Sequence, residues 1–163
     1  SGLGPENDSG ESVDRAEIGL SSEQRELLQA LNELEKPVIL LLCSGRPLEL
    51  SYESENMSAI LAAWKSGVKG AEAICEVLFG DYNPAGRLPV TIPKCLGQLP
   101  VYYSQRPTGK KQFWRDTYLE VDLEPLYEFG FGMSYTNFEY QAVEMSLEEN
   151  AVKIEAEIAN RNL

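Results

Sequence analysis

The stretch Lys36-Pro37-Val38-Ile39-Leu40-Leu41-Leu42-Cys43-Ser44-Gly45 decides the fold class of this chain. Residues 38–42 are a continuous apolar run with the length of one strand, which is typical of a parallel strand buried on both faces. The Lys36-Pro37 pair ends the helical pattern that precedes the run, and Ser44-Gly45 begins a turn after it. A helix followed by a buried strand predicts an α/β layer.

Helical patterns flank this strand on both sides. Ser21-x-x-Gln24 is a capping box, so we predict that a helix begins there and carries one apolar stripe. A second helix is predicted from Gly70 to Phe79 and is closed by Gly80. The residues expected to face inward are Leu27, Leu28, Leu31 and Leu34 in the first helix and Ala71, Ile74, Val77 and Leu78 in the second.

The segment between the helices contains a second strand and two loops of interest. Ala59-Ile60-Leu61-Ala62-Ala63-Trp64 is short and precedes Ser66-Gly67, which favours a second buried strand. The turn 44–47 follows the end of a strand, where open α/β sheets tend to bind ligands. The amides of 67–70 could bind an anion, but close backbone packing is the favoured role for these glycines.

The second half of the chain changes from helical patterns to extended ones. Pro89 and Pro93 confine the alternating segment 88–92 to a sheet edge or an irregular extended path. Residues 94–125 form a long polar and aromatic stretch, which either lines a sugar cleft or pins a loop onto the domain. Its aromatic and basic residues include Tyr102, Tyr103, Phe113, Trp114, Arg115 and Tyr118. The later Gly-x-Gly at 130–132 has no third glycine and is not a dinucleotide fingerprint.

The C-terminal residues alternate strictly between apolar and polar. The pattern runs from Phe138 to Ile158 and is interrupted by a turn at Glu149-Asn150, which predicts a β-hairpin with one buried face. Because a lone hairpin is marginal in water, we interpret this one as the start of a truncated second domain. The chain begins with Ser1-Gly2 and is expected to be a piece of a longer protein.

Composition excludes several classes of function. The formal net charge of −12 argues against nucleic acid and anionic membranes as partners, because both require a basic surface. No apolar run approaches the roughly 20 residues of a membrane helix. The three cysteines, Cys43, Cys75 and Cys95, are widely spaced and odd in number, which excludes a complete disulfide framework, and they are predicted to be small buried hydrophobes. The chain has no histidine, which leaves carboxylates as the leading catalytic candidates.

The candidate catalytic carboxylate is Glu11, which lies in the charged, small-residue loop Asp8-Ser9-Gly10-Glu11-Ser12-Val13-Asp14-Arg15. Small residues around Glu11 permit a sharp turn and a close approach by another group. A glutamate held in this way could serve as a general acid whose pKa is set by burial and nearby charge. The alternative is an ordinary solvated acidic loop near a chain end.

Several motifs in sequence order resemble glycoside hydrolase family 3, the β-glucosidase-like enzymes. The most specific is the stretch Val77-Leu78-Phe79-Gly80-Asp81-Tyr82-Asn83-Pro84-Ala85-Gly86-Arg87-Leu88-Pro89-Val90-Thr91-Ile92-Pro93. Supporting matches are Ser44-Gly45-Arg46-Pro47-Leu48, Gln98-Leu99-Pro100-Val101-Tyr102-Tyr103 and Pro125-Leu126-Tyr127-Glu128-Phe129-Gly130-Phe131-Gly132. The segment Ser9-Gly10-Glu11-Ser12-Val13-Asp14-Arg15 resembles the acid/base loop of the family, and Ser12 replaces its frequent glycine.

This resemblance implies a three-part parent protein. An N-terminal (β/α)8-type barrel would carry the nucleophilic aspartate, an α/β sandwich would carry the acid/base glutamate, and a fibronectin type III-like domain would follow. On this map, residues 1–130 are a partial α/β sandwich with the acid/base loop at 8–15. Residues 131–163 are a linker and the first β-hairpin of the fibronectin type III-like domain.

The same resemblance implies a retaining β-glycosidase that acts without metal or cofactor. Glu11 would be the general acid/base, and the substrate a terminal β-D-glucoside or oligosaccharide, with a β-xyloside next. The barrel of the same parent chain would be the partner, and a homodimer is allowed. The parent is expected in the periplasm or secreted, with the cytoplasm as the alternative. The isolated chain is expected to be inactive because it lacks the nucleophile.

Two rival functions stay open at this point. The chain could be a non-catalytic carbohydrate-binding or interaction module, with the aromatic stretch 102–118 and the hairpin as its surface. It could instead be an unrelated α/β enzyme that binds a ligand near Gly45-Arg46, which the missing phosphate-binding motifs disfavour.

Overall fold

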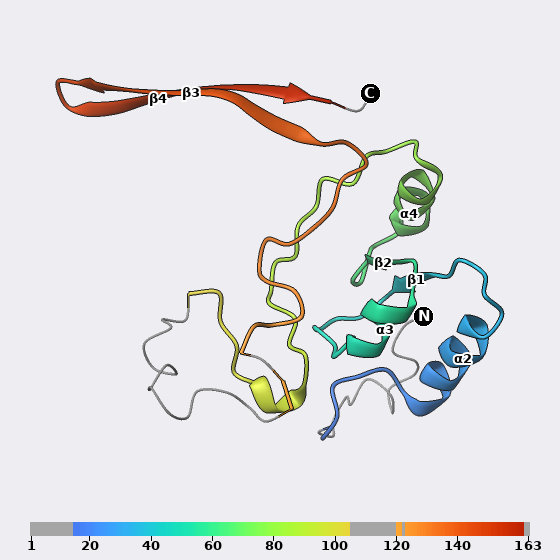
Figure 1. The fold of residues 1–163 in the computed structure, drawn as a ribbon. Helices are drawn as coiled ribbons and strands as arrows, with labels where there is room; N and C mark the ends of the chain where they lie inside the picture. Colours follow the sequence, from blue (N-terminus) through green and yellow to red (C-terminus); the bar gives the residue numbers. More distant parts are fainter. Residues whose placement is uncertain (1–14, 105–119, 122, 162–163) are drawn as a thin grey trace.

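The computed structural model describes residues 15–104, 120–121 and 123–161. Its elements are α2 (Ser22–Asn32), β1 (Ile39–Leu42), α3 (Ser51–Asn56), β2 (Ala59–Ala62), α4 (Gly70–Phe79), the 3₁₀ turn η1 (Leu96–Gln98), β3 (Phe138–Glu148) and β4 (Ala151–Asn160). The helices, a parallel pair of strands and an antiparallel pair match the expected α/β class in outline. In Figure 1 the helices α2 and α3 lie near β1 and β2, whereas the β3–β4 hairpin projects away from them.

Helix α2 begins at its predicted cap. The amide of Gln24 donates to Ser21 Oγ (3.4 Å), and the amide of Ser21 donates to Gln24 Oε1 (3.3 Å), which completes the capping box. The helix ends at Asn32, before the predicted stop at Lys36-Pro37, and Glu35 then adopts a left-handed conformation with φ 50°. The chain therefore turns toward β1 before the proline is reached.

We expect Ser21→Ala to destabilise the fold by about 1 kcal/mol, because the amide of Gln24 at the start of α2 loses its side-chain acceptor. Urea unfolding followed by circular dichroism measures the change. Ser22→Ala is the matched control, since the Ser22 hydroxyl bonds only the exposed Glu23 carboxylate (3.2 Å). Equal losses in the two variants would contradict a capping role for Ser21.

The two predicted strands pair in parallel through a short crossover. Residues Ile39 to Leu42 align with Ala59 to Ala62, and α3, which the sequence patterns did not indicate, lies in the connection. The prediction that β1 is buried on both faces is wrong for this chain. Leu40 and Leu42 are buried, but Ile39 is 54% exposed. Alternation along the strand explains this, because Leu40 and Leu42 point to one face only.

The core lies between α2, the β1–β2 pair and the segment around α3. It consists of Leu20, Leu28, Leu40, Leu42, Leu48, Leu50 and Met57. The predicted leucine stripe of α2 contributes only Leu28 as a fully buried residue, and Leu27 and Leu34 are 60% and 62% exposed. The stripe is therefore narrower than its spacing suggested, because α2 packs along one edge of a small core.

Helix α4 has the predicted bounds but not the predicted burial. It ends at Phe79, and the next residue, Gly80, has a φ of 85°, the left-handed conformation that favours glycine at this position. Ile74 and Val77 are half-buried, whereas Ala71 and Leu78 are exposed. At its start, a Cβ on Gly70 would lie 2.5 Å from Ser66 Cβ, which supports close packing as the role of that glycine.

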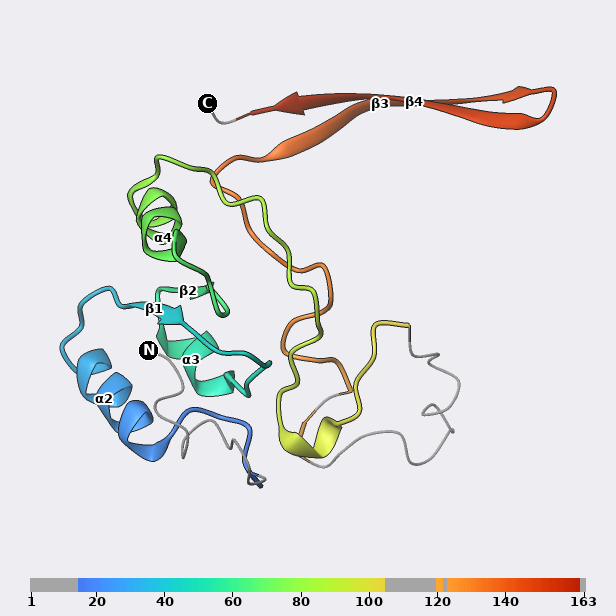
Figure 2. The same ribbon diagram turned by 180° about the vertical axis from the view of Figure 1, so that it is seen from behind.

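Two extended segments run side by side beyond α4, as Figures 1 and 2 both show for the chain near residues 85–93 and 125–133. The amides of Leu88 and Ile92 donate to the carbonyls of Phe131 (2.8 Å) and Tyr127 (2.8 Å). Gly132 fits tightly here, because a Cβ would lie 2.9 Å from the carbonyl oxygen of Gly86. The predicted irregular, edge-like path of 88–92 is confirmed by these isolated bonds.

Side chains then fasten the start of the hairpin to the end of α4. Tyr135 Oη donates to the carbonyl of Val77 (2.5 Å), and the Tyr135 amide donates to Asn83 Oδ1 (2.8 Å). Asn83 Nδ2 donates to Thr136 Oγ1 (3.1 Å), and Ser134 Oγ donates to the carbonyl of Pro84 (2.9 Å). These four bonds form what we call the hinge lock, and they fix where β3 leaves the rest of the chain.

The β3–β4 hairpin is confirmed, but its apolar face is exposed in this chain. Its register pairs Val143 with Ala156, Met145 with Ile154 and Leu147 with Val152, which places the apolar side chains on one face. An irregularity between Tyr140 and Ala142 inserts one extra residue into the alternation of β3. Tyr140, which lies opposite Ile158, is therefore on the same face as the other apolar side chains. The prediction of a buried face is wrong here because both strands are exposed almost throughout.

The cysteines are more exposed than predicted. Cys43 and Cys75 are exposed and Cys95 is half-buried, so the prediction that they are small buried hydrophobes is wrong for the first two. Among the described residues, none of the helices is both long and apolar enough to cross a membrane.

Candidate functional site

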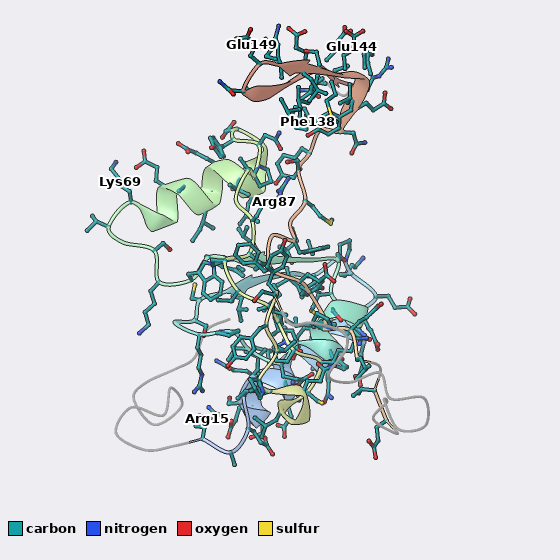
Figure 3. All side chains as sticks on the ribbon, turned by 90° about the vertical axis from the view of Figure 1, so that its left-hand side faces the viewer. Arg15, Lys69, Arg87, Phe138, Glu144 and Glu149 are labelled. Atoms are coloured by element: carbon teal, nitrogen blue, oxygen red, sulfur yellow. The ribbon has the colours of Figure 1, made fainter. Side chains whose placement is uncertain are left out.

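The candidate general acid/base, Glu11, lies outside the described residues, as does the rest of its loop before Arg15. The structure instead shows how the chain that leaves this loop is held. We call residues 15–20 the anchor segment. Figure 3 places Arg15 at the end of the molecule opposite the hairpin residues Glu144 and Glu149.

The anchor segment is fixed at three consecutive positions. The carbonyl of Ile18 accepts a hydrogen bond from the amide of Glu49 (3.1 Å). Gly19 passes so close to Arg25 that a Cβ would lie 3.1 Å from its Nη2 atom. Leu20 is buried in the core, with 5% of its surface exposed. The chain is therefore tied to the body of the domain within a few residues of the loop.

A charge cluster lies under this segment, and we call it the Arg25 cluster. Arg25, on α2, donates from Nε to Glu53 Oε1 (3.3 Å) and from Nη2 to Glu49 Oε2 (3.1 Å). Glu49 Oε1 also accepts the amide of Ser51 (2.8 Å) at the start of α3. One guanidinium thus joins α2 to α3, and its planar fork matches two carboxylates at once.

Burial makes this cluster costly to disturb. Glu53 has no exposed surface, and its Oε2 atom has no hydrogen-bond partner in the described part of the chain. A buried carboxylate of this kind depends on a paired cation. Burial, the largest single influence, lowers the pKa of Arg25, but the charges of Glu53 and Glu49 outweigh it and the pKa is raised. Arg25 is therefore a permanent cation at this position.

An open pocket of about 480 Å³ lies beside the anchor segment. It is lined by Arg15, Glu17 and Leu20 and by the first turn of α2 as far as Arg25. The pKa of Glu23 in that turn is lowered by its own backbone amide and by the Ser21 and Ser22 hydroxyls. The Glu23 carboxylate therefore stabilises the fold at a pH above its pKa in the unfolded chain. This stabilisation is lost as the pH falls through the pKa of Glu23 in the folded chain. Most of the side chains that line the pocket are polar or charged.

The aromatic stretch is described only in part. Phe113, Trp114, Arg115 and Tyr118 lie outside the described residues. The ring of Tyr103 packs against Phe129 at a centroid distance of 5.0 Å, which supports the pinning role at this one position. Tyr102 is exposed.

The turn after β1 and the start of α4, which the sequence suggested as ligand positions, are each held by hydrogen bonds within the segment. In the turn after β1, Ser44 Oγ donates to the carbonyl of Arg46 (2.9 Å) and accepts its amide (3.2 Å). At the start of α4, the amide of Gly70 donates to the carbonyl of Gly67 (2.9 Å). Among the described residues, no group of three or more His, Cys, Asp or Glu side chains could hold a metal ion.

Sequence reasoning did not single out Arg25, Glu49 or Glu53. The one signal was a charged residue at position 25 beside the apolar stripe, but its partners lie 24 and 28 residues further along the chain. Neither spacing belongs to a motif, and the helix that carries Glu53 was not predicted.

The chain is similar in sequence to known proteins. A family model described as the glycosyl hydrolase family 3 C-terminal domain matches residues 3–135. A periplasmic beta-glucosidase of Salmonella typhimurium is 43% identical over 142 residues, which are 83% of this chain and 19% of that protein. A beta-xylosidase of Formosa agariphila is 44% identical over 135 residues, which are 80% of this chain and 18% of that protein.

Solved structures agree with these sequence matches. A beta-glucosidase from Listeria innocua in complex with isofagomine aligns with 98% of this chain and 24% of its own, with 34% identity and a TM-score of 0.79. A beta-glucosidase from Erythrobacter marinus aligns with 91% of this chain and 20% of its own, with 42% identity and a TM-score of 0.77. The chain spans about a fifth of the length of the curated relatives it matches.

Proposed function

We propose a function on the premise that this chain belongs to glycosyl hydrolase family 3, as the match over residues 3–135 shows. The chain is the acid/base-bearing part of a retaining β-glycosidase that removes terminal β-D-glucosyl residues, with β-xylosyl residues as the second choice. The observation that carries this proposal is the agreement of the family match with relatives named beta-glucosidase and beta-xylosidase.

Glu11 is the general acid/base in this proposal. A retaining glycosidase needs two carboxyl groups roughly 5–5.5 Å apart, one to attack the anomeric carbon and one to protonate the leaving oxygen. Glu11 gives its proton to the glycosidic oxygen as the bond to the sugar breaks, and it later takes a proton from the water that releases the sugar. The nucleophilic aspartate belongs to a (β/α)8-type barrel elsewhere in the parent chain, and we nominate none here.

The acid needs a raised pKa to hold its proton near neutral pH. Desolvation where two domains meet raises the pKa of a carboxyl group, and so does the negative charge of the nucleophile nearby. The anchor segment supports a fixed position for the acid, because it ties the chain that leaves the loop to Glu49, just before α3, and to the core.

The chain contains parts of two domains in this proposal. Residues 1–130 form the partial α/β sandwich, and residues 131–163 begin a fibronectin type III-like domain. The support for the second part is the one-sided apolar hairpin, whose exposed face needs a second sheet to cover it. The parent is periplasmic or secreted, in keeping with the periplasmic beta-glucosidase among its relatives. A homodimer stays a prediction.

The competing function is a non-catalytic carbohydrate-binding module. We expect the isolated chain to show neither hydrolysis of an aryl β-glucoside nor measurable heat on calorimetric titration with cellobiose, because it holds one half of a two-carboxylate site. A full-length parent with an inactivated nucleophile is the positive control for binding. Binding of cellobiose by the chain alone, at the strength of that control, would favour the binding module and contradict our proposal.

A further inference from the structure

We propose that the Arg25 cluster is a positioning device for the acid/base loop, with Arg25 as its central residue. The inference rests on the proposed function, since it concerns how Glu11 is held during proton transfer. Arg25 does not touch the substrate in this proposal. It acts through the anchor segment.

The contacts of the cluster with the anchor segment carry the argument. The Arg25 guanidinium lies against the backbone of Gly19, where even a methyl group would come within 3.1 Å of Nη2. Glu49, which Arg25 bonds at 3.1 Å, uses its own amide to hold the carbonyl of Ile18 at 3.1 Å. The cluster therefore touches two consecutive residues of the chain that leaves the loop.

The cluster is more elaborate than the fold requires. The core is built of leucines and a methionine, and an apolar pair could join α2 to α3 with no unpaired oxygen. Instead the chain buries Glu53 completely and leaves Glu53 Oε2 without a partner. Buried ion pairs are weak sources of stability, and in some proteins they select one geometry. A fixed geometry is what proton donation demands, because misplacement of a catalytic group by about 1 Å can cost 10²-fold in rate.

The experiment uses the full-length enzyme and two substrates, an alkyl β-glucoside that needs protonation of its leaving oxygen and an aryl β-glucoside that barely needs it. We expect Arg25→Met to lower kcat/KM for the alkyl substrate by about 10–100-fold and to leave the aryl substrate within about 3-fold. Arg25→Lys should recover only part of the loss, because an ammonium group cannot bond both carboxylates as a fork. Arg161→Met is the control, because Arg161 forms an exposed pair with Glu139 (2.8 Å) on the hairpin.

A double variant separates positioning from mere folding. Arg25→Met with Glu53→Gln removes the uncompensated buried charge, so its thermal midpoint should recover toward that of the parent. The alkyl-specific loss should persist in this variant, because Glu49 and Gly19 still lack the guanidinium. Gly19→Ala, which leaves all charges in place but pushes on Arg25, should give the same alkyl-specific loss.

Two results would overturn the proposal. In one, the double variant regains activity on the alkyl substrate together with stability, which would make the cluster purely structural. In the other, both substrates lose activity equally. Glu11→Ala is measured in parallel. If Glu11→Ala itself spares alkyl glucosides, the proposed function fails; if Glu11→Ala behaves as an acid/base variant and the Arg25 variants do not, only the positioning role fails.

Discussion

Glu11→Ala in the full-length enzyme is expected to lower turnover of an alkyl β-glucoside by about 10²–10⁴-fold, the usual contribution of a positioned general acid. An alkoxide is a poor leaving group, so its departure depends on the proton from Glu11. The phenolate of an aryl glucoside with an acidic phenol leaves almost unaided in the first step. The variant should therefore lose much less activity on this substrate in that step. Comparison of pre-steady-state and steady-state rates on the two substrates measures the difference.

Azide provides the positive test of the same residue. In Glu11→Ala the glycosyl-enzyme intermediate loses the base that activates water, and a small anion can occupy the space of the missing carboxylate. Azide should restore turnover of the aryl substrate and give a glycosyl azide of retained configuration. The falling limb of activity at high pH, which the acid sets, should also disappear. Near-normal turnover of both substrates would leave the family membership standing and assign the proton donor to another residue.

Leu48→Ala is expected to cost about 2–5 kcal/mol of unfolding free energy, because it removes three carbons from a fully enclosed site. Leu48 is 0% exposed and belongs to the core that joins α2, β1 and α3. Urea unfolding of the chain, followed by far-ultraviolet circular dichroism, measures the loss.

Leu27→Ala is the matched control for this prediction. Leu27 is also a leucine near the core, but 60% of its surface is exposed, so its replacement should change the stability by less than about 0.5 kcal/mol. Equal losses in the two variants would mean that the core lies elsewhere than around Leu48.

The Leu27 and Leu48 pair also shows what the sequence could reveal about this fold. The start of α2, the end of α4 and the two strands of the hairpin were predicted well, because a capping box, a left-handed glycine and strict alternation act over a few residues. Leu27 was predicted to be inside because helical spacing shows which residues share a face. Spacing alone does not show how much of that face is covered.

Burial was therefore the weaker part of the prediction. Ile39, Leu78 and the apolar face of the hairpin are exposed in this chain, although each lies in an element that was correctly identified. Their coverage depends on other packed layers, which a periodic pattern does not specify. The short helix α3 was missed because it spans six residues and has no side-chain cap for a motif to reveal.

The candidate site likewise has one part that local sequence signals revealed and one part that they did not. Glu11 came from a motif of adjacent residues, and its role stays a prediction because it lies outside the described residues. The Arg25 cluster came only from the structure, because Arg25 meets carboxylates 24 and 28 residues away. Local signals identify candidate chemistry, whereas the long-range contacts that would position it require coordinates.

The hinge lock has a practical consequence for dividing this protein. Tyr135 and Thr136 precede the hairpin in sequence, yet they bond back to Val77 and Asn83. A truncation at residue 130 would therefore strip four hydrogen-bonded side-chain contacts from the end of α4 and unpair Leu88 from Phe131. A cut after Asn137 would remove β3 and β4 while leaving these bonds in place, which makes it the better end point for a shortened version of this chain.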